Sequence, residues 1–149
     1  MITLRCAGCG IEVPVAGGLP PFVCPRHSDG GFHVLRPYLS KPSAGGTPAF
    51  AHPFLRFADR MLAYHRCREY GLEHAQLYHA TVEKLTEQVT YLTGKKFVHT
   101  PLFRSDALSA HFGLSESGGV YVKDETANPG GSHKGRHLFG IMVELLVGE

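Results

Sequence analysis

The sequence from residue 122 to residue 137 reads Val-Lys-Asp-Glu-Thr-Ala-Asn-Pro-Gly-Gly-Ser-His-Lys-Gly-Arg-His. The run 120–123 predicts a short strand, the segment 126–132 predicts a loop, and the apolar segment from about residue 132 to 147 predicts a helix. A strand that gives way to a helix leaves backbone N–H groups unpaired, and such junctions commonly hold ligands in open α/β sheets. The segment therefore indicates an α/β fold with a ligand site at this junction.

Lys134 falls in the first turn of the expected helix, and its neighbours do not match two common lysine motifs. A Walker phosphate loop requires glycine directly before the lysine, where this chain has His133. A penicillin-binding type Ser-x-x-Lys motif has two intervening residues, whereas Ser132 and Lys134 are separated by one. On composition alone, Lys134 would be an exposed lysine in a surface turn.

The segment resembles the lysine motif of fold-type II pyridoxal-phosphate (PLP) enzymes, the tryptophan synthase β-like group, and within that group the threonine synthases. Their pattern is a strand ending in Lys-x-Glu, followed by Asn-Pro-x-x-Ser-x-Lys-x-Arg. It is matched at Lys123, Glu125, Asn128, Pro129, Ser132, Lys134 and Arg136. Thr100-Pro-Leu102 resembles the Thr-Pro-Leu that precedes this motif in the family. His133 departs from the pattern, since threonine synthases usually have phenylalanine there.

The resemblance implies an enzyme that uses PLP on an amino-acid substrate. Lys134 would be the catalytic residue that forms the internal aldimine and later moves the α- or β-proton, with Ser132 and Asn128 beside the cofactor. The reaction would be a β- or γ-elimination or replacement, catalysed by a lyase or synthase. The fold would be a parallel open sheet with flanking helices, and the complete protein would be a homodimer.

Three further parts of the family's cofactor site have no match in this chain. They are the glycine-rich loop that grips the phosphate, the Ser-x-Asn loop beside the ring, and the residue that faces the pyridine nitrogen. PLP acts as an electron sink only when such groups hold it. We therefore expect this chain to be a truncated amino-terminal part of the enzyme, inactive by itself.

Three of the four cysteines lie close to the amino terminus. Cys6 and Cys9 form one pair and Cys24 and His27 a second, each with two intervening residues, and 14 residues separate the pairs. This spacing predicts two metal-binding knuckles with a structural Cys₃His zinc site, against the alternative of unrelated cysteines and a histidine. The segment also resembles the zinc ribbon at the amino terminus of many threonine synthases, which usually ends in cysteine. His33 is an alternative fourth ligand.

The rest of the chain predicts a module at residues 1–36, a linker rich in proline and glycine at 37–52, and the amino-terminal part of a catalytic domain at 53–149. Apolar spacing predicts one amphipathic helix from Pro53 to Gly71 and another from about 73 to 94. The apolar face of the second helix comprises Tyr78, Val82, Leu85, Val89 and Leu92. A short helix is expected from about 105 to 112.

Composition limits the classes of function. The 149 residues are 43% hydrophobic and 19% charged, which is typical of a soluble globular domain. The net charge of +2 and the lack of a basic run argue against nucleic acid or a membrane surface as the partner. We see no signal peptide or apolar run of spanning length and expect a cytoplasmic protein with a small-molecule substrate. The alternative is a non-catalytic zinc-ribbon interaction protein, or a degenerate remnant of the enzyme.

Overall fold

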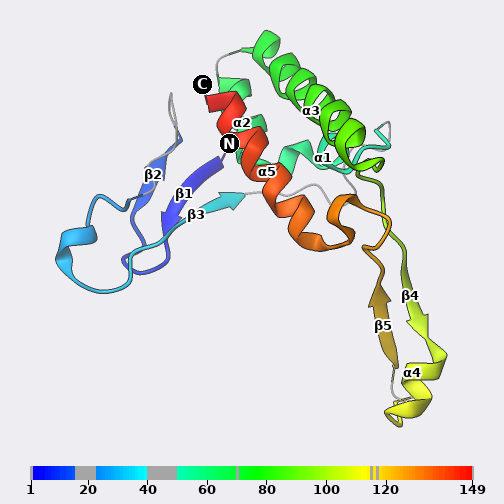
Figure 1. The fold of residues 1–149 in the computed structure, drawn as a ribbon. Helices are drawn as coiled ribbons and strands as arrows, with labels where there is room; N and C mark the ends of the chain where they lie inside the picture. Colours follow the sequence, from blue (N-terminus) through cyan, green and yellow to red (C-terminus); the bar gives the residue numbers. More distant parts are fainter. Residues whose placement is uncertain are drawn as a thin grey trace.

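A computed structural model describes residues 2–15, 23–39, 50–69, 71–114, 116 and 118–148. Three parts follow one another along the chain: a small sheet, a body of helices, and a two-stranded arm whose second strand leads back to the last helix (Figure 1). The structure is thus a mixed α/β protein.

The small sheet has β1 (Ile2–Cys6) at its centre, with β2 (Glu12–Pro14) and β3 (Leu35–Leu39) antiparallel on either side. Its apolar cluster is small: Leu4 and Val15 are buried, and partly buried neighbours that include Leu62 of the helical body pack against them. β3 extends through Leu39, into the segment expected to be a linker. Residues 40–49 of that segment lie outside the described residues.

The segment from Pro53 to Gly71 is broken, so the expectation of one continuous helix is wrong. It forms α1 (Pro53–Arg56), a 3₁₀ turn (Ala58–Arg60) and α2 (Leu62–Glu69), with extended backbone at Met61. The buried positions explain the break. Residues 54, 55 and 58 are buried, yet the next buried positions are 63, 66 and 67, where a continuous helix would bury 61, 62 and 65. The break at Met61 supplies this shift of phase.

The next helix, α3 (Leu72–Thr93), follows the sequence prediction closely. It ends at Gly94, whose left-handed φ of 68° is a conformation that favours glycine. Tyr78, Val82 and Leu85 are buried as expected. Leu92, which was expected on the same buried face, is 79% exposed, because the last turns of α3 extend beyond the core.

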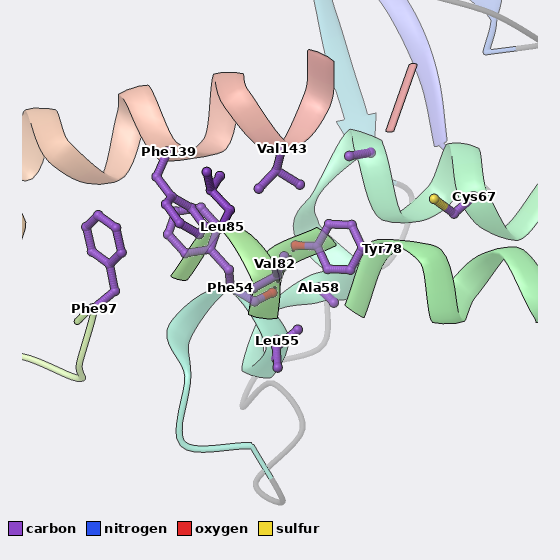
Figure 2. Close-up of a cluster of buried hydrophobic side chains, with 11 residues drawn as sticks. Phe54, Leu55, Ala58, Cys67, Tyr78, Val82, Leu85, Phe97, Phe139 and Val143 are labelled. Carbon is purple, nitrogen blue, oxygen red and sulfur yellow. Dashed lines mark hydrogen bonds between the residues drawn. The ribbon is translucent and has the colours of Figure 1, made fainter. Parts of the chain in front are cut away.

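The main hydrophobic core lies between α1, α2, α3 and α5 (His133–Gly148), as Figure 2 shows. Phe139 of α5 packs against the rings of Phe54 and Phe97, with centroid distances of 4.6 and 4.8 Å. The Tyr78 hydroxyl donates to the carbonyl of Phe54 at 3.0 Å. These contacts fix α5, and with it the first turn that carries Lys134, on the helical body.

The arm consists of β4 (Leu102–Ser105) and β5 (Val120–Lys123), with α4 (Asp106–His111) at its tip (Figure 1). The expected strand at 120–123 and the short helix are confirmed. The expected parallel open sheet is not: within the described ranges all strand pairing is antiparallel. The reason is topological, because α4 and its turn reverse the chain, whereas a parallel pair requires a crossover back to the starting end.

The last helix, α5, is apolar nearly all round, as predicted. Phe139 and Val143 face the core, while other large apolar residues are exposed: Leu138, Ile141, Met142, Leu145 and Leu146. No helix in the described part of the chain is both long and apolar enough to span a membrane.

Candidate functional site

Four potential metal ligands converge at one end of the small sheet. The side-chain ligand atoms of Cys6, Cys9, Cys24 and His33 all lie within 4.8 Å of one another. The Sγ atoms of Cys9 and Cys24 are 3.7 Å apart, and Cys6 Sγ is 3.6 Å from Nδ1 of His33. Thiolates about 2.3 Å from a tetrahedral zinc ion are separated by roughly 3.8 Å. The cluster therefore could bind a metal ion such as zinc.

The backbone around the cluster has the form of a metal-binding knuckle. The N–H of Gly10 donates to the carbonyl of Cys6 at 3.0 Å, with Gly10 at a φ of 73°. A Cβ at Gly8 would lie 2.0 Å from the carbonyl oxygen of Phe32, so only glycine lets the loop before His33 pass this closely. The N–H of Arg26 points at the sulfur of Cys24, 3.4 Å away. The first and last of these contacts shape the individual knuckles, and the close approach at Gly8 brings the loop before His33 against the first knuckle.

The electrostatics of Cys6, Cys24 and His33 differ. The backbone N–H of Cys9 stabilises the thiolate of Cys6 and lowers the pKa of Cys6 to about 6. Burial raises the pKa of Cys24. The Gly30 carbonyl, 3.1 Å from Nε2 of His33, raises the pKa of His33 and also orients its ring. Such a contact on the other ring nitrogen is typical of metal-bound histidines.

The structure places His33, and not His27, at the fourth corner of the cluster. His27 lies in a 3₁₀ turn (His27–Asp29) with its Nδ1 3.0 Å from the carbonyl of Cys24, so its ring is directed at the backbone. Spacing alone favoured His27, because it completes the second Cys-x-x-ligand pair. The loop that returns to β3 brings in His33, nine residues after Cys24 in the sequence.

The second candidate site is the loop between β5 and α5, which is held by a network of polar side chains centred on Glu125. Glu125 Oε1 accepts from the Thr100 hydroxyl at 2.5 Å, and Oε2 accepts from Asn128 Nδ2 at 2.8 Å and Arg136 Nε at 2.7 Å. Arg136 and Asn128 also bind the backbone of Val98. The Arg136 guanidinium lowers the pKa of Glu125 to about 2, assisted by the Thr100 and Asn128 hydrogen bonds.

The network ties the segment before the arm to the loop after it. Thr100 and Asn128 are fully buried, and Lys123 at the end of β5 donates to the hydroxyl of Thr100. Asn128, expected beside the cofactor, uses its side chain within this network. Thr100 and Glu125 also hold the loop through this network. The sequence motif contains both residues but does not reveal this structural role.

The loop closes tightly on the first turn of α5. Gly130 and Gly131 have positive φ angles of 72° and 60°, as expected for this loop. Ser132 precedes α5 with extended backbone, and its carbonyl accepts from the N–H of Gly135 at 3.2 Å. A Cβ on Gly135 would lie 2.5 Å from the carbonyl oxygen of Pro129, so this glycine permits the contact between helix and loop.

Lys134 is exposed on this first turn. Within the part of the chain that the structure describes, its amine makes no hydrogen bond or ion pair. The fixed loop thus presents an amine available to react, with Ser132 half-buried beside it. The segment from the end of β5 to the first turn of α5, residues 124–134, is called the lysine loop below. The lysine loop and the metal cluster belong to separate parts of the molecule (Figure 1).

Comparison of the chain with protein-family models, curated proteins and solved structures finds no match.

Proposed function

We propose that the chain is part of a PLP-dependent enzyme acting on an amino acid, with Lys134 as the amine that carries the cofactor. The observation that supports this is the convergence of motif residues. Thr100, Glu125, Asn128 and Arg136 meet in one network, and that network holds the loop from which Lys134 projects. A solvated lysine in a surface turn does not require such support. An amine that must react with a carbonyl carbon in a fixed position does.

The residues around Lys134 fit an aldehyde cofactor that bears a phosphate. Lys134 is exposed and its amine is unengaged among the described residues. It lies in the first turn of a 16-residue helix, where backbone N–H groups lack helical partners and the dipole favours an anion. Ser132 adds a hydroxyl at the same turn. Asn128 and Glu125 serve to hold the loop.

When bound, PLP supplies an electron sink for negative charge at a substrate carbon. Lys134 contributes the covalent attachment and, once free, an amine at the same place that accepts or returns a proton on that carbon. Arg136 and Glu125 keep the first turn of α5 in register with the loop. The resemblance to threonine synthases favours β- or γ-elimination or replacement, the chemistry of a PLP-dependent lyase or synthase.

The residues of this chain set a limit on the proposed function. No segment of the 149 residues matches the family's phosphate loop or the group facing the pyridine nitrogen. We therefore propose that this chain captures the cofactor without completing turnover.

The zinc ion proposed for the cluster of Cys6, Cys9, Cys24 and His33 is structural, because four protein ligands leave no open position.

The test is covalent capture of PLP by the 149-residue chain. PLP at one equivalent is added, the imine is reduced with borohydride, and the modified residue is located by mass spectrometry. Modification of Lys134 is expected. Lys134→Ala is expected to abolish it, and Lys84→Ala, which removes another exposed helical lysine, is the matched control. Labelling spread evenly over exposed lysines, or unchanged in Lys134→Ala, would contradict the proposal.

A second function is favoured by the metal cluster: a non-catalytic zinc-ribbon interaction protein. It predicts stoichiometric zinc without selective modification of Lys134 in the same experiment. Measuring zinc content and the site of PLP attachment on one sample therefore distinguishes the two functions.

A further inference from the structure

One face of the small sheet carries two arginines side by side. Arg5 of β1 and Arg36 of β3 are direct partners in the antiparallel register, and Thr3 and Tyr38 form the next pair on the same face. Leu4 points to the opposite face and is buried, so the arginine face is the outer one. Both arginines are exposed, and Tyr38 is 53% exposed.

This pairing is unfavourable unless an anion is present. Side chains directly opposite on antiparallel strands have Cβ atoms about 5 Å apart, and like charges there destabilise the sheet. Among the described residues, neither arginine has an acidic partner. Glu12 of β2 is the other partner of Arg5 in the register, yet no ion pair joins them. The row of side chains formed by Glu12, Arg5 and Arg36 across the three strands therefore has a net positive charge.

The same residues line a hollow of about 620 Å³. Arg5, Arg36 and Tyr38 form one side, and the backbone of the first knuckle, residues 7–10, forms another. Guanidinium groups bind the oxygens of a phosphate in bidentate fashion, and two of them on neighbouring strands can bind one phosphate group together. The Tyr38 ring offers an apolar surface for the rest of a ligand.

We propose that this hollow binds the phosphate group of a small organic phosphate. A concave site with two arginines suits a small molecule, whereas nucleic acid would require a longer basic surface than a chain of net charge +2 provides. The site lies beside the metal cluster, through Cys6 and Cys9, and is independent of Lys134.

The experiment is a titration of the zinc-loaded 149-residue chain with inorganic pyrophosphate and with ADP, followed by isothermal calorimetry and amide chemical shifts. Arg5→Gln and Arg36→Gln are each expected to weaken binding about tenfold. Arg26→Gln is the matched control, an exposed arginine of the same module outside the hollow, and is expected to leave binding unchanged. Glu12→Gln removes the one carboxylate of the row and is expected to tighten binding roughly threefold.

Arg5→Lys and Arg36→Lys guard against a folding defect in the glutamine variants, because they keep the charge and lose only the fork. Intermediate affinity is expected. Lack of binding by the unmodified chain at millimolar ligand, an equal loss in Arg26→Gln, or tighter binding of a single-stranded oligonucleotide than of pyrophosphate would overturn the proposal.

Discussion

The metal cluster and the lysine loop are both tight turns that hold reactive side chains, yet different forces hold them. The apolar cluster of the small sheet is built on Leu4 and Val15, so its main cross-links are the contacts among the metal-cluster residues. The lysine loop is fixed by a charged hydrogen-bond network and by α5, which is anchored in an aromatic core. Stability in the first region should therefore depend on a metal, and in the second on buried side chains.

Removing the metal should give the largest effect and should separate the two regions. In small zinc modules, on the order of 10 kcal/mol of metal binding is coupled to folding. Chelation is expected to abolish amide protection in β1 and β3 while protection in α3 and α5 persists, as measured by hydrogen exchange. Loss of protection in both regions at once would break the comparison.

Variants of single residues sharpen this prediction. Cys24→Ala is expected to lower zinc affinity strongly, whereas Cys67→Ala, at a buried cysteine of the helical core, should not. His33→Ala should lower zinc affinity by more than tenfold, and His27→Ala should change it little. The reverse result for the two histidines would show that His27 is the fourth ligand.

Each region contains one glycine whose replacement should disrupt only that region. Gly8→Ala brings Cβ against the Phe32 carbonyl, and Gly135→Ala brings it against the Pro129 carbonyl. Each is expected to cost about 3 kcal/mol, since the clashing atoms are backbone. Gly8→Ala should reduce zinc affinity and leave the thermal unfolding of the helices unchanged, and Gly135→Ala should do the opposite. Gly8 and Gly135 do not have positive φ angles, so the cost in both variants comes from the clash alone.

The network at Glu125 should make the lysine loop sensitive to acid. The pKa of Glu125 is lowered to about 2, so its stabilisation is complete above its ordinary value of 4.5 and is lost as pH falls toward 2. Glu125→Gln is expected to cost about 2 kcal/mol at neutral pH and to flatten stability between pH 4.5 and 2. Denaturant unfolding as a function of pH measures both. An unchanged profile in the variant would contradict this assignment.

His52 should make stability depend on pH in a higher range than Glu125 does. Its Nε2 is 3.0 Å from the Thr86 hydroxyl within the aromatic core, and burial, with Arg136 and Lys96 nearby, lowers the pKa of His52 to about 4. The unfolded chain binds this proton first, so stability should fall from pH 6.5 toward 4, by on the order of 1–2 kcal/mol. His52→Gln should remove this slope and keep that of Glu125. The slope is measured by unfolding at fixed pH values.

The sequence predicted local features of both sites better than their packing. Spacing predicts Cys6, Cys9 and Cys24 as ligands, because a knuckle is a local turn. Spacing favours His27 over His33, since the position of His33 depends on the return of a loop to β3, which is a long-range contact. The helix α3 and its stop at Gly94 followed from periodicity, whereas the break at Met61 depends on core contacts. The sequence does not predict the antiparallel arm, because strand direction depends on pairing partners and a run such as 120–123 does not encode them.

Lys134→Ala should have the smallest effect on stability and so provides the sharpest separation of scaffold from chemistry. An exposed lysine without a partner among the described residues contributes within roughly 0.5 kcal/mol to folding. The variant should therefore unfold like the parent, keep its zinc and lose only reductive attachment of PLP. If Lys134→Ala were strongly destabilised, the side chain would be part of the packing and its loss of PLP would carry no information. Unchanged unfolding combined with lost attachment would mean that the network around Glu125 holds the loop with or without the amine it presents.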